Sequence, residues 1–119
     1  MNSSQPVFLH IADRIESDII TGVYKTDDLI ISTTQISKLY NVNPTTAVKA
    51  VGKLLDAGVL YKRRGIGMCV APGAKETITA KRKKVFLEQT LDEVIAEARV
   101  LGIDTEHLVN LITERENND

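Results

Sequence analysis

The sequence predicts a mainly helical α+β protein with one short β-hairpin and a helical C-terminal arm. Apolar residues recur at helical spacing in residues 6–21, 32–40 and 44–57. A glycine-bearing segment rich in β-formers follows at residues 59–72, and residues 76–101 contain no proline or glycine. Because Pro72 and Gly73 interrupt the chain between these segments, we expect two domains, residues 1–72 and 73–119.

The composition is that of an ordinary globular protein. Of the 119 residues, 43% are hydrophobic and 26% are charged. There is no run of about 18 apolar residues that could span a membrane, and the N-terminus lacks the pattern of a signal peptide. The one cysteine, Cys69, cannot form an internal disulfide. We therefore expect a cytoplasmic protein that does not associate with membranes.

The first predicted helix spans residues 6–21. Pro6 suits the first helical turn, where a missing N–H costs nothing, and Gly22 stands where a left-handed C-cap is expected. Residues 23–28 should then form a loop.

Two short helices joined by a tight turn come next. Ser32 and Gln35 match the capping box that begins a helix at residues 32–40. Asn43 suits an N-cap and Pro44 the first position of the following helix, residues 44–57. The residues expected on the apolar sides of these helices are Ile36, Leu39, Tyr40, Ala47, Val48, Val51, Leu54 and Leu55. Such a pair of helices forms a helix-turn-helix.

A β-hairpin is expected directly after the second of these helices. Val59, Leu60 and Tyr61 are β-formers, and the second β-run is Met68, Cys69 and Val70. Gly65 and Gly67 lie between the two runs, which favours a tight turn. A hairpin in this position is the wing of a winged helix, so the fold class becomes a winged helix-turn-helix followed by a two-helix arm.

Charge is divided unevenly along the chain, although the net charge is only −1. Residues 38–84 carry eleven Lys or Arg against two acids, whereas residues 85–119 carry two Arg against nine acids. A basic middle and an acidic tail indicate surfaces with different partners. A basic helix-turn-helix and wing favour double-stranded DNA as a partner, since the second helix of this motif enters the major groove with its N-terminus.

The DNA-contacting residues are predicted from this geometry. Hydroxyls at a helix N-terminus suit phosphate oxygens, Lys49 can donate to guanine O6 or N7, and the wing arginines can reach phosphates or the minor groove. The alternative is that the polar residues only cap the helix and solvate its face. The predicted DNA-binding set is Ser32, Thr34, Asn43, Thr45, Thr46, Lys49, Lys53, Arg63, Arg64, Gly65 and Gly67.

The arm carries an apolar seam that one small winged helix cannot cover. Its residues follow a spacing of four and three in the long helix, and Asp104 can cap a final helix. We expect a homodimer interface formed by Leu87, Leu91, Val94, Ala98, Leu101, Leu108, Leu111 and Ile112. The alternative is that the two helices of the arm pack against each other within one chain.

No residues are spaced for catalysis, a cofactor or a metal ion. His10 and His107 lack neighbouring ligands, and Cys69 has no partnered histidine. We therefore expect neither an enzyme nor a bound cofactor. A winged-helix module that binds only proteins is the alternative function, and the basic bias of residues 38–84 opposes it. An RNA-binding role lacks aromatic stacking residues.

Residues 6–72 resemble the GntR family of bacterial transcription regulators. The resemblance rests on Ile11-Ala12 through Ile15 and Ile19-Ile20 with Gly22, on Ser32-Thr33-Thr34-Gln35-Ile36-Ser37, on Val42-Asn43-Pro44-Thr45-Thr46 with Lys49-Ala50, Leu54 and Ala57-Gly58, and on residues 65–70. The Asn-Pro-x-Thr form and the short two-helix tail are similar to the YtrA subfamily.

This resemblance implies a dimeric winged-helix repressor that binds a palindromic operator, and for many subfamily members a neighbouring ABC-transporter operon. The family's effector domain is absent, and the sequence leaves open whether a small-molecule effector binds. The chain departs from the family pattern at Thr34, where arginine is usual, and at Ile31, where proline is usual. Threonine can bind a phosphate but cannot form a bidentate contact with guanine, so Lys49 and the wing should contribute more of the binding.

Overall fold

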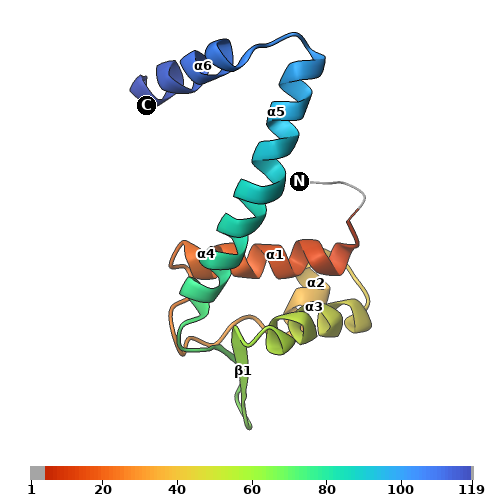
Figure 1. Cartoon of the computed structure of the whole chain (residues 1–119). Coiled ribbons are helices and arrows are strands. Elements are labelled where there is room, and N and C mark those ends of the chain that lie inside the picture. The colour runs from red at the N-terminus through yellow and green to blue at the C-terminus, as the bar shows by residue number, and fades with distance from the viewer. Residues whose placement is uncertain (1–4, 119) are drawn as a thin grey trace. The chain divides into compact units, whose positions relative to one another are not determined.

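A computed structural model of the chain describes residues 5–118 and divides it into two compact units, Met1–Ala80 and Lys81–Asp119. In the first unit, α1 (Val7–Ile20), α2 (Thr33–Tyr40) and α3 (Pro44–Asp56) are followed by a hairpin of β1 (Leu60–Arg63) and β2 (Gly67–Val70) (Figure 1). The second unit contains the end of α4 (Ala74–Val85), then η1 (Phe86–Thr90), α5 (Leu91–Val100) and α6 (Thr105–Asn117). The prediction of a mainly helical chain with one small hairpin is confirmed.

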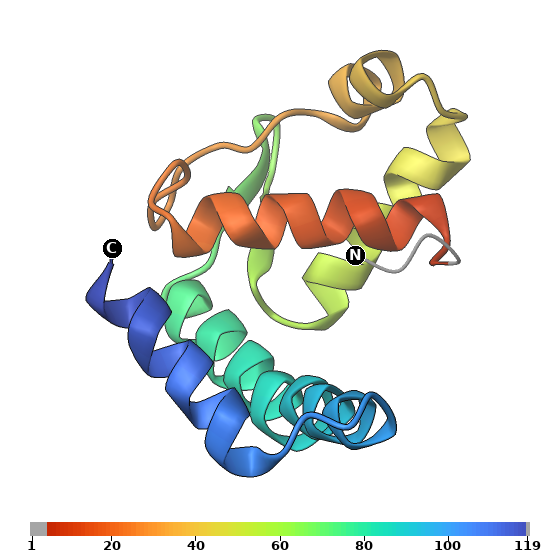
Figure 2. The same ribbon diagram turned by 90° about the horizontal axis from the view of Figure 1, so that it is seen from above.

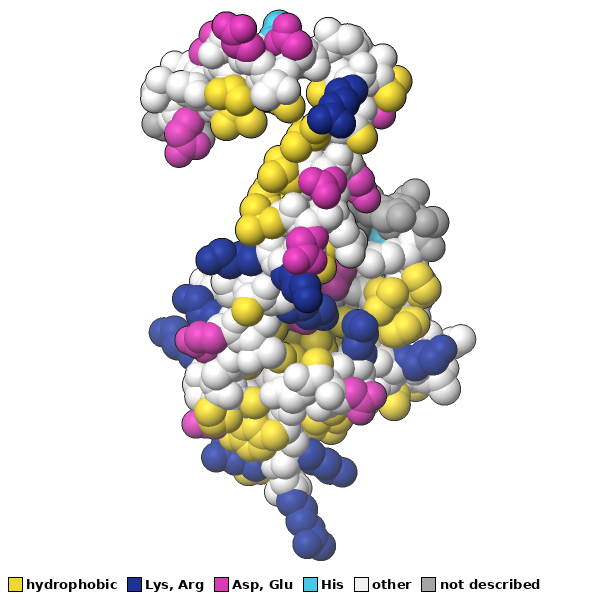
Figure 3. Space-filling model, viewed as in Figure 1, with side chains coloured by type: hydrophobic (Ala, Val, Ile, Leu, Met, Phe, Trp, Pro, Cys, Tyr) yellow, Lys and Arg dark blue, Asp and Glu magenta, His cyan; other side chains and the backbone are white. Residues whose placement is uncertain are grey.

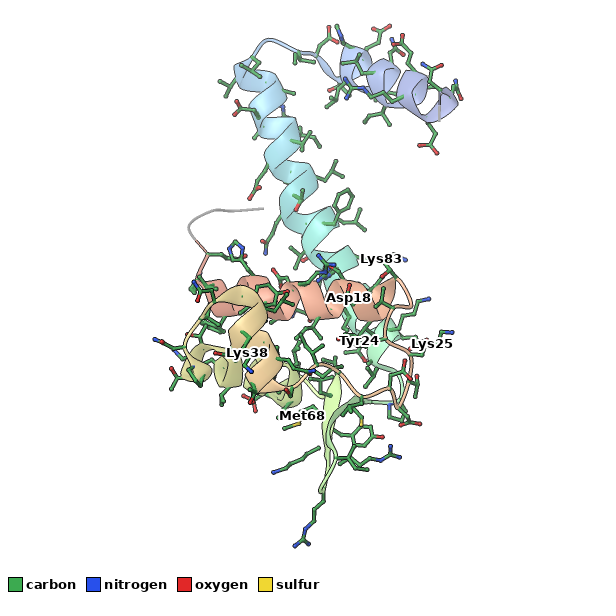
Figure 4. All side chains as sticks on the ribbon, turned by 180° about the vertical axis from the view of Figure 1, so that it is seen from behind. Asp18, Tyr24, Lys25, Lys38, Met68 and Lys83 are labelled. Carbon is green, nitrogen blue, oxygen red and sulfur yellow. The ribbon has the colours of Figure 1, made fainter. Side chains whose placement is uncertain are left out.

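One apolar core holds the first unit together. Helices α1 and α2 both pack against α3 (Figures 1 and 2). Tyr24 and Met68, labelled in Figure 4, pack against the edge of this core. The core consists of Ile11, Ala12, Ile15, Ile19, Ile30, Ile36, Ala47, Ala50, Val51, Leu54, Val59, Leu60, Val70, Ala74 and Ile78. Since Ala74 and Ile78 belong to it, the first turns of α4 are part of this unit, and the boundary lies after Ala80 rather than after residue 72.

The capping signals at the start of α2 act as predicted. The Ser32 Oγ accepts from the Gln35 N–H at 3.1 Å, and the Gln35 Oε1 accepts from the Ser32 N–H at 2.8 Å. Asn41 adopts a left-handed conformation (φ 52°) that ends α2, and Pro44 begins α3. Two short helices are thereby joined by a tight turn.

Two residues predicted on the buried sides of these helices are exposed. Leu39 on α2 is 70% exposed and Val48 on α3 is 56% exposed. Helical spacing alone placed both beside apolar neighbours, but the core covers a narrower face of each helix than the apolar pattern suggested.

A third segment of the chain pairs with the two-stranded wing. Strands β1 and β2 pair antiparallel, with Leu60 opposite Val70 and Arg63 opposite Gly67. Residues 27–30, at the end of the expected loop and just after it, also pair with β2. The Asp27 N–H donates to the Val70 carbonyl at 2.8 Å, and the Ile30 N–H donates to the Met68 carbonyl at 2.9 Å. This pairing ties the base of the hairpin to the segment that leads into α2.

The long helix predicted at residues 76–101 contains a π-helical turn, η1. A π-turn adds a residue to the helical repeat and so rotates the side chains that follow it relative to those before it. Leu87 lies within this turn, and the regular four-and-three seam is therefore interrupted there. Among the residues that the structure describes, no helix is long and apolar enough to cross a membrane.

Candidate nucleic-acid interface

The outer face of α3 carries the polar residues that the sequence singled out. Thr45, Lys49 and Lys53 are exposed and Thr46 is half-buried, because the opposite face of the helix enters the core. Positions 45, 49 and 53 are four residues apart and follow one line along a helix. The three side chains therefore form a continuous polar edge.

Lys49 is oriented by an aromatic ring of α1. Its Nζ lies 5.2 Å from the centre of the Phe8 ring, within the range of a cation–π interaction. An exposed interaction of this kind contributes about 0.5–1 kcal/mol, so the ammonium can leave the ring for a stronger partner. This contact could not be predicted from the sequence, because residues 8 and 49 are far apart along the chain.

Asn43 does not cap α3 through its side chain. It occupies the N-cap position with extended backbone angles (φ −62°, ψ 147°), and its carbonyl accepts from the Thr46 N–H at 3.0 Å. Within the described residues, its side chain forms no capping hydrogen bond, which corrects the expectation that it would. The amide of Asn43 is thus exposed and available to an external partner.

Helix α2 presents two further predicted residues. Ser32 is exposed, and its Oγ accepts the capping hydrogen bond while its hydroxyl hydrogen remains able to donate. Thr34 is exposed in the first turn of the same helix. Lys38, labelled in Figure 4, extends from α2 into solvent.

The tip of the wing is basic. Lys62, Arg63 and Arg64 are all exposed, and Figure 3 shows Lys and Arg side chains along the hairpin that projects from this unit. The Ile66 N–H donates to the Arg63 carbonyl at 2.9 Å and closes the turn. Gly65 has a φ of 76°, which explains the glycine at that position.

The structure of the chain itself explains why glycine stands at position 67. Its φ is 142°, and an added Cβ would lie 2.9 Å from Cδ1 of Leu29. The wing therefore packs against the third segment here. The positive φ favours glycine here whether or not DNA is bound.

A hydrogen bond that the sequence did not predict anchors the wing. The Tyr61 hydroxyl donates to Oδ1 of Asp27 at 2.8 Å, and Asp27 adopts a left-handed conformation with a φ of 68°. This hydrogen bond is the main reason why the pKa of Tyr61 lies above its usual value near 10. No signal in the sequence links residues 27 and 61, because their contact depends on the packed wing.

Within residues 5–118, the cations of α3 and the wing have no carboxylate partner. Lys49, Lys53, Arg63 and Arg64 form no ion pair there, whereas Arg14 Nε lies 3.2 Å from Asp18 Oδ1 on α1. Uncompensated positive charge on one small unit attracts a polyanion.

The predicted dimer residues lie in the second unit, and most of them expose apolar surface. Leu91, Leu108 and Leu111 are half-buried, whereas Ala98 is 6% exposed. The exposed members are Leu87, Val94, Leu101 and Ile112, at 55%, 47%, 64% and 57%. Packing within one chain therefore leaves much of the seam uncovered.

The described His, Cys, Asp and Glu side chains form no cluster suited to a metal ion. Over residues 5–118, no group of three His, Cys, Asp or Glu is placed to hold a metal ion. Cys69 is buried in β2. The Nε2 of His10 is buried and, within the described part of the chain, has no hydrogen-bond partner.

Three helices with a tight turn before the third, followed by a basic two-stranded wing, define a winged helix-turn-helix protein. A solved structure of a GntR-family transcriptional regulator from Bacteroides thetaiotaomicron is similar to this chain, with a TM-score of 0.75, 33% sequence identity, and coverage of 95% of this chain and 98% of that one. The chain belongs to the GntR family of transcriptional regulators.

Two other proteins extend the comparison. The HTH-type transcriptional regulator YhcF of Bacillus subtilis is 25% identical over 90% of this chain and 87% of its own length. The DNA-binding domain of AraR, solved in complex with its operator ORX1, is 30% identical, covers 56% of this chain and 81% of its own, and has a TM-score of 0.54. No protein-family model matches the chain. Because these relatives are transcription regulators, the prediction that the chain is not an enzyme is confirmed.

Proposed function

We propose that this protein is a homodimeric repressor that binds a palindromic operator in double-stranded DNA. The observation that carries the proposal is the uncompensated basic surface formed by the outer face of α3 and the wing. Thr45, Lys49 and Lys53 are exposed on that face, and Arg63 and Arg64 are exposed at the hairpin tip. The complex of the AraR domain with an operator supports DNA as the ligand of a similar unit.

The proposed contacts divide by chemistry. The Ser32, Thr34, Thr45 and Thr46 hydroxyls donate to phosphate oxygens near helix N-termini, where the helix dipole favours negative charge. Lys49 leaves the Phe8 ring to donate to a guanine edge, and Asn43 offers an amide to a neighbouring base. Lys53, Arg63 and Arg64 neutralise phosphates, while Gly65 and Gly67 let the wing backbone approach DNA closely.

In this proposal the second unit, Lys81–Asp119, pairs two copies of the chain. The uncovered apolar side chains of Leu87, Val94, Leu101 and Ile112 support this, because a monomer would leave them in water. Leu91, Ala98, Leu108 and Leu111 complete the proposed interface. Pairing would place two copies of α3 on half-sites about one helical turn of DNA apart, or a multiple of that distance.

The biological role follows from these parts. An occupied operator excludes polymerase, which makes the regulator a repressor. The short arm and the Asn43-Pro44-Thr45-Thr46 sequence support membership of the YtrA subfamily and regulation of a neighbouring operon such as that of an ABC transporter. A regulator of this kind acts in the cytoplasm.

A gel-shift titration tests the proposal. The full-length protein is titrated into duplex DNA from upstream of its own gene and into a shuffled duplex of equal length at moderate salt. A complex that prefers the upstream duplex is expected. Equal binding to both would refute an operator-specific function, and no binding to either would favour a module that binds only proteins.

Replacing Lys49 refines this test. If Lys49 reads a base, Lys49→Ala should weaken binding to the preferred duplex by roughly 1–3 kcal/mol and leave binding to the shuffled duplex nearly unchanged. An equal loss on both duplexes would instead identify Lys49 as a phosphate contact.

A further inference from the structure

Val48 is an apolar side chain on the face of α3 that bears the proposed DNA contacts. It is 56% exposed, although the other alanine, valine and leucine residues of the helix are buried or half-buried. Thr45 precedes it by three residues and Gly52 follows it by four, so the three positions adjoin one another on a helix. Together they form a smooth strip without charge, which we call the Val48 strip.

Gly52 provides a second, independent observation. It lies in the interior of α3, where glycine is unfavourable compared with alanine by roughly 0.8–1.0 kcal/mol. An added Cβ would meet no atom within 4 Å among the described residues, and the backbone there does not need positive φ. Nothing within the chain therefore requires glycine, whereas a close approach of another molecule to the helix backbone would.

Lys49 does not cover the strip. Its ammonium lies over the Phe8 ring of α1 at 5.2 Å, and so the charge is held to one side of α3. The valine methyl groups remain accessible beside it. At its centre Val48 thus offers hydrocarbon, rather than a hydrogen-bond donor, to the floor of a DNA groove.

We propose that Val48 contacts the 5-methyl group of a thymine in each half-site and thereby determines the base at that position. Within the major groove, the thymine methyl is the only apolar group that a base pair presents, and apolar side chains recognise it by contact. The absent side chain at Gly52 allows the helix to approach closely enough. This inference rests on the proposed DNA-binding function and adds the identity of one base.

The test begins with selection of preferred duplexes from a random pool by the full-length protein. Each thymine of the preferred half-site is then replaced by deoxyuridine, which removes the methyl group and leaves the Watson–Crick edge unchanged. At one thymine, the replacement should weaken binding of the unaltered protein about fourfold per half-site, the effect of exposing one methyl-sized group.

Two variants test whether the fourfold weakening of binding comes from a contact of Val48 with the thymine methyl group. For Val48→Ala the same deoxyuridine replacement should leave affinity unchanged, because the contact is already missing. Val23→Ala is the matched control, since Val23 is 65% exposed on the loop after α1, and this variant should retain the fourfold loss. Circular dichroism checks that both variants are folded.

The outcomes separate the two proposals. Two outcomes overturn the role of Val48 but leave operator-specific binding intact. In the first, removing the methyl group of any thymine of the enriched sequence leaves affinity unchanged. In the second, the deoxyuridine replacement weakens the unaltered protein and Val48→Ala equally. A pool with no enriched sequence refutes operator-specific binding and the thymine contact together.

Discussion

Replacing Gly52 by alanine should separate the stability of the first unit from its binding of DNA. The substitution adds one methyl group in the interior of α3, at a position where that group would meet no atom within 4 Å in the described chain. The gain comes from helix propensity alone, which favours alanine by roughly 0.8–1.0 kcal/mol. We therefore expect Gly52→Ala to be more stable than the unaltered protein.

Urea unfolding followed by circular dichroism measures this gain. A gain of about 1 kcal/mol corresponds to a rise of about 4–8 °C in the Tm of a domain of 60–100 residues, and so thermal unfolding provides a second readout. Gly58→Ala is the matched control. An added Cβ at Gly58 would also lie in open space, but the φ of that residue is 75°. The control should lose about 1 kcal/mol, because a left-handed conformation is unfavourable for alanine.

The same variant should bind the preferred duplex more weakly despite its greater stability, because the new methyl group keeps the helix away from the groove. A Gly52→Ala protein that is no more stable than the unaltered one would show that the position is already occupied, and the reasoning from open space would be wrong. Stabilisation without weaker binding would refute a close approach of DNA at Gly52.

Three further predictions concern the wing and the arm. Arg63→Ala and Arg64→Ala should each lower the slope of log K against log salt by about 0.9, if each arginine neutralises one phosphate; an unchanged slope in salt titrations would place both outside the interface. The hydrogen bond to Asp27 stabilises protonated Tyr61, so its contribution is complete below pH ~10 and is lost as pH rises through the higher pKa of the folded state. Urea titrations should therefore show Tyr61→Phe less stable than the unaltered protein at neutral pH, with the difference vanishing in strong alkali; a difference independent of pH would contradict this. Leu101→Asp should convert a dimer into a monomer by light scattering, whereas Leu39→Asp, on a residue that is 70% exposed in the first unit, should not; a dimer that survives Leu101→Asp would exclude that residue from the interface.

Local signals account for most of the fold that could be predicted. The capping box of Ser32 and Gln35, Pro44 at the start of α3 and the glycine in the wing turn each act over a few residues. Their hydrogen bonds and backbone angles are therefore decided before distant segments meet. The uneven distribution of charge can also be read directly from the sequence, and it indicated a polyanion as the partner.

Exposure on α3 could not be predicted with the same success. The apolar pattern placed Val48 on the buried side, yet it is 56% exposed, and Lys49 lies over the ring of Phe8, which is far from it in the sequence. The helical repeat of apolar residues predicts which side of a helix is buried, but not how wide the buried surface of that helix will be. That width depends on the helices that pack against it.

The three helices of the first unit, the capping box of α2, the hairpin and the positive charge of the wing could all be predicted, because each depends on residues close together in the chain. The packing of the unit was needed to show that Leu29 lies against Gly67, that Asp27 accepts the hydrogen bond of Tyr61 and that Val48 remains exposed. These contacts join segments far apart in the chain, and their geometry exists only after the core has packed.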